Sequence, residues 1–286
     1  MAWMHLDLTI KAIKMRFESL FILLLINVIL TSSCAVKAQD NIDFKEQYSY
    51  ENFIVNNDTL NYRMLLPKNF KKDKQYPLVL FLHGSGERGN DNKAQLVHGS
   101  KLFADENNRD NFSSIIIFPQ CPKNDYWSKV DVDRSSYPIK LSFKYDDGPT
   151  KPMQLVINLI DNMLDKPFVK KEQVYIMGLS MGGMGTFELI HRKPEMFAAA
   201  IPICGGGDPN SVSNYAKTLP IWVFHGAQDN VVDPQLSIDM VSAILKEGGF
   251  PKFTLYDFAN HNSWDPAFAE PELLSWLFSN KKSTDE

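Results

Sequence analysis

The chain has 286 residues, of which 44% are hydrophobic and 22% charged, with 15 glycines and 16 prolines. This composition is that of a globular protein and excludes a collagen-like, low-complexity or wholly disordered chain. The formal charge of −4 leaves no basic excess to neutralise phosphates, which argues against a nucleic-acid partner. Three cysteines are too few for a disulfide scaffold.

Residues 1–38 have the order of regions found in a secretory signal peptide. Lys11, Lys14 and Arg16 precede a mainly apolar run over 20–30. This run is too short to cross about 30 Å of hydrocarbon as a helix, so we expect no transmembrane span. The segment predicts an exported protein, periplasmic or extracellular. The alternative is an amphipathic or buried N-terminal helix.

The same segment holds two candidate processing sites. Val36-Lys37-Ala38 suits cleavage by ordinary signal peptidase before Gln39, whereas the stretch from Leu30 to Cys34 resembles a lipoprotein box. In the second case Cys34 would carry a lipid anchor. The sequence leaves both open, and either one predicts export.

From residue 39 onward, candidate strands and helices alternate, which predicts a mostly parallel sheet covered by helices on both faces. Unbroken apolar runs such as 77–82 are typical of strands buried on both faces. The expected strands are 47–55 and 60–66 as an antiparallel pair, then 77–82, 114–118, 173–177, 198–203, 221–224 and 253–258. The expected helices are 153–164, 180–193, 234–246 and 271–280. We therefore predict a single α/β domain over 39–286, with an irregular insertion near 122–150.

The most informative motif is Gly178-Leu179-Ser180-Met181-Gly182, which lies between a predicted strand and a predicted helix. In that context G-x-S-x-G is a nucleophile elbow, a strained turn that lifts the serine hydroxyl above the sheet. Glycines are needed beside the serine because a side chain there would collide with the neighbouring strand or helix. We expect Ser180 to be a catalytic nucleophile.

A serine needs a base to take its proton, and the base needs an acid to orient it. In elbow enzymes the acid and then the histidine follow the serine along the chain. Two histidines do so here. His225 ends a predicted strand, where we expect it to pack under the following loop. His261 follows the last predicted strand in a loop that can reach back to the serine, so it is the predicted base.

Two aspartates compete for the role of the acid, because Asp229 and Asp233 both follow the strand predicted at 221–224. Asp229 lies nearer the end of that strand, where the catalytic groups of such sheets gather. Asp233 precedes Pro234 and is typical of a helix cap. We favour Asp229.

An oxyanion hole requires two backbone N–H donors, one from the residue after the nucleophile and one from the loop after the third strand. The first donor is the amide of Met181. The second loop reads His83-Gly84-Ser85-Gly86, and the amide of Ser85 is the expected donor. We expect the next two residues, Glu87 and Arg88, to stabilise this loop as a local ion pair.

Together these motifs resemble the α/β-hydrolase superfamily. The resemblance is to the secreted esterase group of polyhydroxybutyrate depolymerase-like and feruloyl or acetylxylan esterase-like proteins, often described as predicted peptidases or as dienelactone hydrolase-related. It extends over about 60–280, and the segments that carry it are Leu82–Gly89, Pro119–Pro122 with Trp127, Gly178–Gly183, Pro202–Asp208, His225–Asp229, and His261 with Trp264. The resemblance implies Ser180 as nucleophile, His261 as base and Asp229 as acid. The chain departs from the family at Asp233, where proline is more common.

The chemistry expected from these residues is two-step acyl transfer, which requires neither a metal nor an organic cofactor. The His, Asp and Cys residues do not fall in metal-ligand spacings. Three aromatic residues are candidate substrate contacts, because they lie in loops on the active-site side of the predicted sheet: Tyr126, Trp127 and Trp264. Such side chains suit a feruloyl ring or the face of a sugar. Loop packing is the alternative.

Cys121 and Cys204 each follow a predicted strand. The strand order usual for this fold separates those strands by three spacings, roughly 14 Å. A disulfide requires Cα atoms within about 7 Å. We therefore expect two free and buried thiols.

The predicted function is that of a secreted serine carboxylic ester hydrolase acting on acyl groups of polysaccharides. One alternative is a serine peptidase of the prolyl oligopeptidase-like type, which would normally carry an extra domain to select peptides. The other is a non-catalytic binding module on a hydrolase scaffold, which would be expected to lack part of the triad. Fold alone does not give function, so the substrate rests on the resemblance.

Overall fold

The computed structural model describes residues 43–283. The predicted signal peptide and the candidate anchor at Cys34 lie outside the described residues. Within the described part of the chain, no helix is both long enough and apolar enough to cross a membrane.

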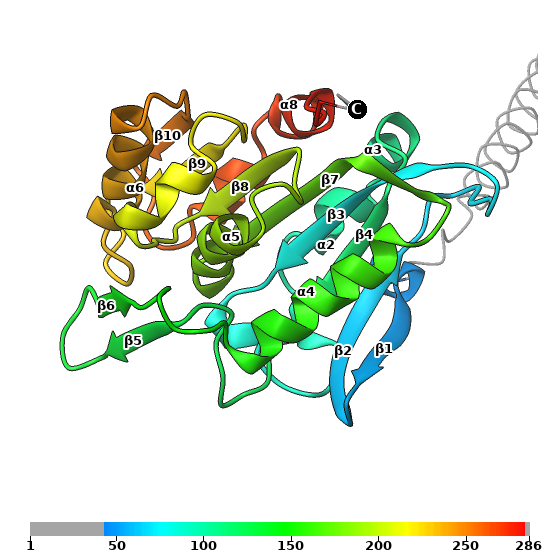
Figure 1. The fold of residues 1–286 in the computed structure, drawn as a ribbon, viewed down its shortest axis with the longest axis horizontal. Helices are drawn as coiled ribbons and strands as arrows, with labels where there is room; N and C mark the ends of the chain where they lie inside the picture. The colour runs from blue at the N-terminus through cyan, green and yellow to red at the C-terminus, as the bar shows by residue number, and fades with distance from the viewer. Residues whose placement is uncertain (1–42, 284–286) are drawn as a thin grey trace, which may run out of the picture. The chain divides into compact units, whose positions relative to one another are not determined.

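A twisted sheet of eight strands forms the centre of the molecule, in the order β1-β2-β4-β3-β7-β8-β9-β10 (Figure 1). Pairing is antiparallel for β1–β2 and β2–β4, and parallel from β4 onward to β10. The strands are β1 (Ser49–Val55), β2 (Asp58–Leu65), β3 (Tyr76–Leu82), β4 (Ile115–Pro119), β7 (Val169–Leu179), β8 (Ala199–Ile203), β9 (Trp222–Gly226) and β10 (Lys252–Tyr256). The predicted α/β class, with a mostly parallel sheet, is confirmed.

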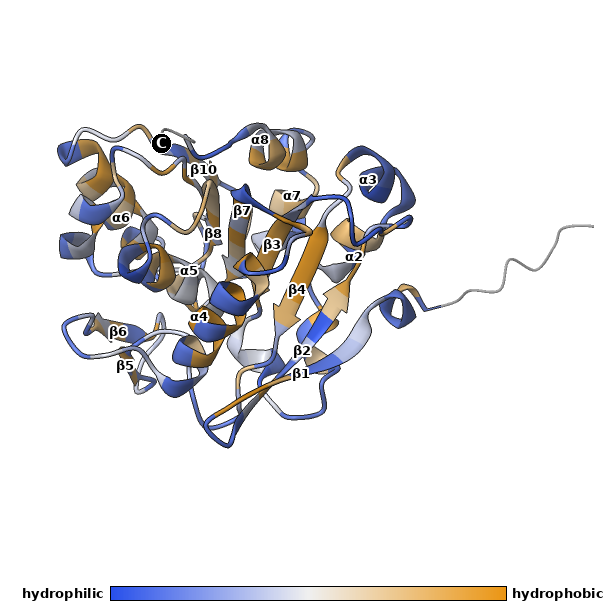
Figure 2. Cartoon of the chain, turned by 45° about the vertical axis from the view of Figure 1, so that its right-hand side comes forward, coloured by the Kyte–Doolittle hydropathy of each residue, from blue (hydrophilic) through white to orange (hydrophobic). Residues whose placement is uncertain are grey.

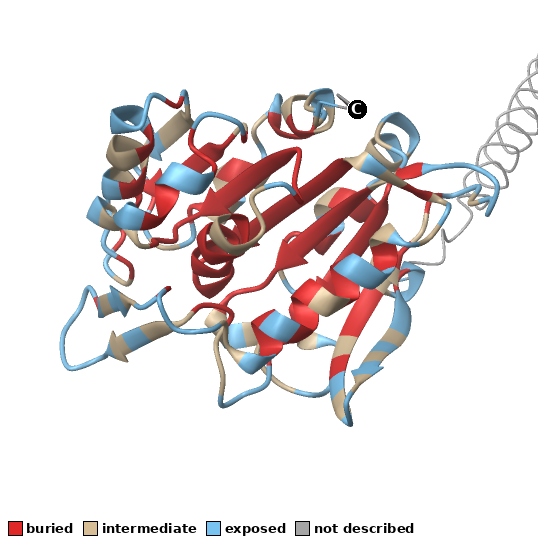
Figure 3. Ribbon diagram, viewed as in Figure 1, coloured by how far each residue is buried: buried red, intermediate tan, exposed pale blue. Residues whose placement is uncertain are grey.

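Helices cover both faces of the sheet and give the molecule two apolar layers. One layer contains side chains of α4 (Lys151–Leu164), α5 (Met181–Arg192) and α6 (Gln235–Lys246). The other contains side chains of α2 (Ser100–Ala104), α7 (Trp264–Phe268) and α8 (Leu273–Ser279). Strands β3, β4, β8 and β9 are buried almost throughout, which is why their sequences are continuously apolar (Figures 2 and 3).

Three short α-helices of the described residues have no counterpart among the predicted elements. They are α2, α3 (Glu106–Asn111) and α7, each of five or six residues. A helix of one or two turns presents too few residues for an apolar period of 3.6 to be visible. The longer helices agree with the prediction to within a few residues at each end.

We predicted an irregular insertion near 122–150, but this segment is partly regular. It contains a two-stranded antiparallel sheet of β5 (Val130–Asp133) and β6 (Lys140–Phe143). The buried carboxylate of Glu188 in α5 holds the start of this hairpin, because it accepts a hydrogen bond of 2.8 Å from the hydroxyl of Ser128. At the other strand, the amide of Ile139 donates to the carbonyl of Val231 at 2.9 Å. The hairpin is thus attached to the body by contacts that are distant in sequence.

The strand order also decides the state of two cysteines. Cys121 follows β4 and Cys204 follows β8, with β3 and β7 between them. Both thiols are free and fully buried. The prediction of two free, buried thiols is confirmed.

Candidate active site

The turn from β7 into α5 holds Ser180 in a strained conformation. Its backbone has φ 54° and ψ −117°, a region that costs a non-glycine residue about 1–3 kcal/mol. A Cβ added to Gly182 would lie 1.9 Å from the carbonyl oxygen of Leu82, and one added to Gly178 would lie 2.2 Å from that of Gly182. Glycine at position 182 therefore lets the start of α5 pack directly against the end of β3, and glycine at position 178 lets β7 approach the first turn of α5. The serine hydroxyl lies at the carboxyl end of the sheet.

The structure brings Ser180, His261 and Asp229 together in one chain of hydrogen bonds. Nε2 of His261 lies 3.0 Å from Oγ of Ser180, and its Nδ1 lies 2.8 Å from Oδ2 of Asp229. The serine follows β7, the aspartate follows β9 and the histidine follows β10. Because the carboxyl ends of parallel strands meet at one edge of the sheet, residues far apart in the chain converge there.

Asp229 is fixed by four hydrogen bonds although its carboxylate is fully buried. Oδ1 accepts from the amides of Val231 and Val232, each at 2.9 Å. Oδ2 faces both His261 and His225, the latter at 3.2 Å. Burial alone would raise the pKa of Asp229, but the hydrogen bonds from the two histidines outweigh it and hold the pKa well below its usual range. The carboxylate is therefore charged at neutral pH.

Among the described residues, Asp233, the alternative acid, makes no hydrogen bond to Ser180 or His261. Its Oδ1 accepts a hydrogen bond of 2.9 Å from the amide of Gln235, at the start of α6. It caps the helix, as the sequence indicated.

The expected oxyanion loop lies beside the nucleophile. Met181 is the first residue of α5, where the helix leaves its N–H groups without intrahelical acceptors. In the loop after β3, a Cβ built on Gly84 would lie 3.7 Å from Cβ of Ser180. Ser85 directly follows this glycine, and its carbonyl accepts from Nε of Arg88 at 2.9 Å.

The predicted ion pair between Glu87 and Arg88 is wrong. Arg88 donates to the backbone carbonyls of Ser85 and Asp125 instead, at 2.9 and 3.2 Å. The carboxylate of Glu87 turns toward the site, where Oε1 lies 3.8 Å from Nε2 of His98. The loop is therefore held by an arginine bound to carbonyls, and the glutamate lies beside Gly84 and His98.

Trp127 does not form a wall for substrate, contrary to the expectation from its loop position. Its side chain is fully buried, and Nε1 donates to the carbonyl oxygen of His83 at 3.1 Å. It packs against α5 where Gly185 leaves room, since a Cβ on that glycine would lie 2.6 Å from Cβ of the tryptophan. Trp127 thus lies between α5 and the start of the loop after β3, and its hydrogen bond stabilises that loop.

The other two aromatic candidates are half-buried. One face of Tyr126 is covered by the guanidinium of Arg88, 4.7 Å from the ring centre. Trp264 lies against the site, because its ring centre is 5.4 Å from that of His261 and 5.0 Å from that of His98. Of the three predicted contacts, only Trp264 lies directly on a member of the hydrogen-bonded chain.

Two buried histidines, His83 and His225, complete the site, although the sequence motifs predicted a catalytic role for neither. His83 accepts a hydrogen bond of 3.0 Å from the amide of Cys121 at Nε2, while its Nδ1 lies 2.6 Å from the carbonyl of Gly84. His225 packs under the loop after β9 as expected, but it also contacts Asp229. Each of these histidines directly precedes a glycine at the end of a strand, in His83-Gly84 and His225-Gly226. This repeated His-Gly pair is the sequence signal from which both residues could have been predicted.

Among the described residues, one cluster has side chains of the kinds that bind metals: Cys204, Asp229 and His261, whose ligand atoms lie within 4.8 Å of one another. The contacts present do not suit a metal. Burial raises the pKa of the Cys204 thiol far above its usual range, so the thiol is protonated when no metal is bound. Both nitrogens of His261 are already committed to Ser180 and Asp229.

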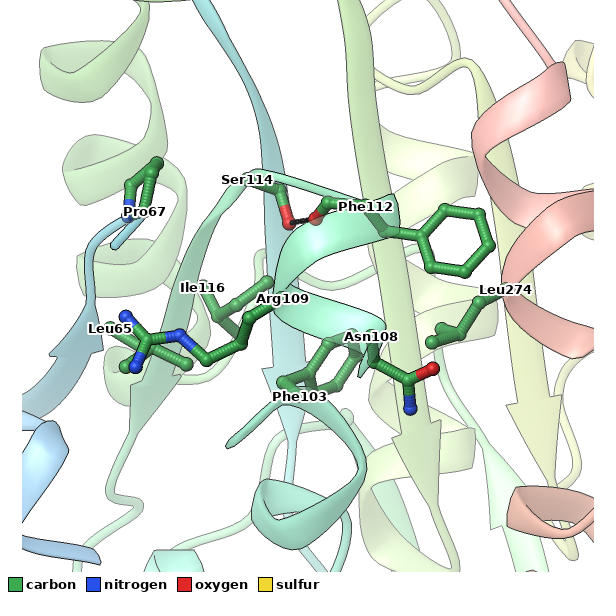
Figure 4. A pocket seen from close by; sticks show the side chains of 9 residues that line it. All are labelled: Leu65, Pro67, Phe103, Asn108, Arg109, Phe112, Ser114, Ile116 and Leu274. Carbon is green, nitrogen blue, oxygen red and sulfur yellow. Dashed lines mark hydrogen bonds between the residues drawn. The ribbon is translucent and has the colours of Figure 1, made fainter. Parts of the chain in front are cut away.

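The pocket shown in Figure 4 is not part of this site. Ser114 and Ile116 place it at the amino end of β4, whereas Ser180 lies at the carboxyl edge of the sheet. Its volume of about 10 Å³ is that of a single water molecule.

The mostly parallel sheet, the strained serine turn and the Ser–His–Asp contacts are those of an α/β-hydrolase of the serine hydrolase class. The chain belongs to the phospholipase/carboxylesterase family, whose model matches residues 69–270.

Two solved structures are similar to this chain. A thermostable esterase is 35% identical with a TM-score of 0.75, over 84% of this chain and 64% of its own. A CE1 ferulic acid esterase from Anaeromyces mucronatus, solved with ferulic acid, has a TM-score of 0.59 and covers 80% of this chain and 89% of its own. At 15% identity, that second likeness shows the fold alone.

A curated relative matches over a shorter length. The bifunctional acetylxylan esterase/xylanase of Neocallimastix patriciarum is 33% identical over 91 residues, which is 32% of this chain and 13% of the relative. The chain thus spans only a small part of that relative and 64% of the thermostable esterase.

Proposed function

We propose that this protein hydrolyses carboxylic esters by acyl transfer to Ser180, with His261 as general base and Asp229 as the group that orients it. The observation that carries the proposal is the chain of contacts from Oγ of Ser180 to Nε2 of His261 at 3.0 Å, and from Nδ1 to Asp229 at 2.8 Å. A charged aspartate fixes the proton on Nδ1 and leaves Nε2 free to accept the serine proton.

In the first step His261 takes the proton of Ser180 as the oxygen attacks the ester carbonyl. The negative charge that develops on the carbonyl oxygen is stabilised by the amides of Met181 and Ser85 and by the amino terminus of α5. Asp229 stabilises the imidazolium that forms. The alcohol then leaves with the proton from Nε2.

In the second step water repeats the sequence on the acyl-enzyme. His261 accepts a proton from water, the hydroxide attacks the acyl carbon, and the proton returns to Oγ of Ser180 as the acid leaves. The general base, the nucleophile and the oxyanion donors of these steps all belong to the chain, and water is the second nucleophile.

The substrate class we infer is acyl groups carried by polysaccharides, acetyl or feruloyl. The acetylxylan esterase/xylanase relative supports this inference through the 91 residues that match. The half-buried ring of Trp264 beside His261 offers an aromatic contact for a feruloyl ring or a sugar face. A pocket of about 320 Å³ adjoins the carboxyl end of β4. Its lining combines apolar residues such as Leu60 and Leu155 with Asn124, which offers a hydrogen-bonding group to a longer substrate.

The first test is hydrolysis of p-nitrophenyl acetate and methyl ferulate by the wild type, Ser180→Ala and Ser275→Ala. Ser275 lies exposed on α8 and serves as the matched control. Removing a nucleophile that acts in a triad lowers kcat by about 10⁶-fold, so we expect no measurable turnover from Ser180→Ala. Turnover of either ester by that variant at the wild-type rate would refute the proposal.

We also propose that the protein is exported. The basic and apolar regions of residues 1–38 support this proposal, and Cys34 and the Ala38–Gln39 bond are the two candidate processing sites. Mass spectrometry of the amino terminus of protein made in a bacterial host tests it. A chain that begins at Gln39, or at an acylated Cys34, supports export, whereas a chain that retains residues 1–33 contradicts it.

A further inference from the structure

His225 lies at the end of β9, fully buried, and its ring connects three parts of the molecule. Its Nδ1 lies 2.7 Å from Oγ of Ser237 on α6, and its Nε2 lies 3.1 Å from the carbonyl of Val232. The same Nε2 lies 3.2 Å from Oδ2 of Asp229. The mechanism proposed above does not use this histidine.

The neighbours of Nε2 decide where the ring carries a proton. A backbone carbonyl and a carboxylate are both acceptors only, so the nitrogen between Val232 and Asp229 must be the donor. Asp229 is not the donor, because the amides of Val231 and Val232 and the ring of His261 already donate to it. The Nε2 proton of His225 is therefore shared between the carbonyl and Oδ2.

The contacts of Nδ1, the other ring nitrogen of His225, are compatible with a proton on Nε2. Ser237 has one hydroxyl proton, and its Oγ lies between Nδ1 of His225 and the carbonyl of Gly205, the latter at 3.0 Å. When the serine donates to Nδ1 the ring is neutral, and when it donates to Gly205 the ring is an imidazolium. In both arrangements Nε2 carries its proton toward Asp229.

We propose that His225 is a positioning residue of the active site, which donates to the same oxygen of Asp229 that receives the Nδ1 proton of His261. This inference rests on the proposed role of Asp229 as the orienting acid. Oδ1 is fixed by two amides, whereas Oδ2 is shared by the two histidines. His225 thus sets both the direction of the carboxylate and how strongly it attracts the imidazolium of His261.

The groups around this oxygen come from three strand ends. His225 belongs to β9, His261 follows β10, and Cys204 follows β8 with its ligand atom within 4.8 Å of Asp229 and His261. Oδ2 of Asp229 therefore has two histidine donors, and the buried Cys204 thiol is the third titratable group that faces the carboxylate. Removing one donor leaves more of the carboxylate charge for His261, which stabilises its protonated form.

The test uses two substitutions that differ in one property. His225→Leu keeps most of the volume and removes the donor, whereas His225→Gln keeps an N–H donor near the position of Nε2. Partners that orient metal-binding histidines contribute 10- to 100-fold, and by analogy we expect kcat to fall about tenfold or more in His225→Leu with KM unchanged. The acidic limb of its kcat/KM profile should move to higher pH, and His225→Gln should recover most of kcat.

The matched control is His191→Leu. His191 also places a ring nitrogen near a backbone carbonyl, 3.1 Å from Ser211, and it lies on α5 away from Asp229. We expect that variant to keep the wild-type kcat and pH profile. If His225→Leu keeps them too, or if His225→Gln is no better than His225→Leu, the inference is wrong.

One measurement does not depend on whether the variants fold. Nitrogen-15 NMR of histidine-labelled wild type should show a protonated Nε2 at His225, and an unprotonated Nε2 would overturn the inference. Ser180→Ala, assayed in parallel, separates the two proposals. Activity in Ser180→Ala refutes the proposed function, whereas an inactive Ser180→Ala beside a fully active His225→Leu refutes the role of His225 alone.

Discussion

Nε1 of Trp127 donates a hydrogen bond of 3.1 Å to the carbonyl oxygen of His83, and both side chains are almost completely buried. Their ring centres lie 5.2 Å apart. The contact joins the loop after β4 to the start of the loop after β3, which contains Ser85. A residue that never touches substrate can therefore fix the position of an oxyanion donor.

Trp127→Phe tests this support, because it keeps most of the ring volume and removes the donor. A lost buried hydrogen bond costs about 1–3 kcal/mol of unfolding free energy. We expect kcat to fall as well, since the His83 carbonyl is freed next to the oxyanion loop. Trp222→Phe is the matched control: Trp222 is also fully buried, and its Nε1 donates to Thr254 at 3.0 Å. It should lose similar stability and keep kcat, and equal losses of kcat in the two variants would contradict the assignment.

His83 should make the stability of the protein sensitive to pH. Burial lowers the pKa of His83 to about 4, while the unfolded chain titrates near 6.5. Below pH 6.5 the unfolded state binds a proton that the folded state does not, so stability is complete above 6.5 and falls as the pH decreases toward 4. The difference amounts to about 3 kcal/mol, to be measured by urea unfolding at pH 7.5 and 4.5.

His83→Gln keeps an acceptor for the amide of Cys121 and does not titrate. We expect its unfolding free energy to change less between those two pH values than that of the wild type. Asp229 acts in a separate range, because its lowered pKa gives stability that is present above the ordinary aspartate pKa and is lost only at lower pH. If the unfolding free energy of His83→Gln changes with pH between 4.5 and 6.5 as steeply as that of the wild type, another group is responsible for the pH dependence.

The elbow should tolerate no side chain at Gly182. A Cβ there would lie 1.9 Å from the carbonyl oxygen of Leu82, a backbone atom that cannot move without shifting β3. We expect Gly182→Ala to lower the unfolding free energy by about 3 kcal/mol or more and to abolish esterase activity. Gly86→Ala provides the comparison, since a Cβ on Gly86 meets nothing within 4 Å. Thermal unfolding and p-nitrophenyl acetate assays of both variants test this expectation. Equal Tm values for Gly182→Ala and Gly86→Ala would show that the turn has room for a side chain at position 182.

The sequence predicted the central sheet because burial on both faces leaves a local signature. The expected strand 198–203 corresponds to Ala199–Ile203, and 77–82 corresponds to Tyr76–Leu82. The residues of the hydrogen-bonded chain were predictable for a different reason. The elbow motif fixes Ser180 locally, and the parallel topology fixes the order in which the acid and the base must follow.

The remaining features depend on contacts that no local pattern records. The hairpin β5–β6 starts at Ser128, which binds Glu188 sixty positions later. The role of His83 depends on the amide of Cys121, 38 positions away. The position of Trp127 in a loop at the active-site edge does not reveal that its ring turns inward, into space left by Gly185. Such contacts appear only once the chain is folded.

A last expectation concerns the charge of the substrate. A point 3.7 Å from Cβ of Ser180, where a Cβ on Gly84 would lie, is only 3.0 Å from Oε2 of Glu87. The side chain of Glu87 is 13% exposed, so little water screens its charge. We expect this carboxylate to disfavour esters that carry a negative charge near the reacting carbonyl. Glu87→Gln should therefore raise kcat/KM for p-nitrophenyl hemisuccinate about fivefold relative to p-nitrophenyl acetate.

The salt dependence separates this electrostatic effect from a change in loop shape. Raising the ionic strength should reduce the difference in kcat/KM between the two esters in the wild type. It should have little influence on that difference in Glu87→Gln. Glu195→Gln is the control, because Glu195 is exposed in the connection before β8, at the amino edge of the sheet opposite Ser180. If Glu87→Gln lowers the activity on both esters equally, the carboxylate acts by holding the oxyanion loop and not by repelling charge.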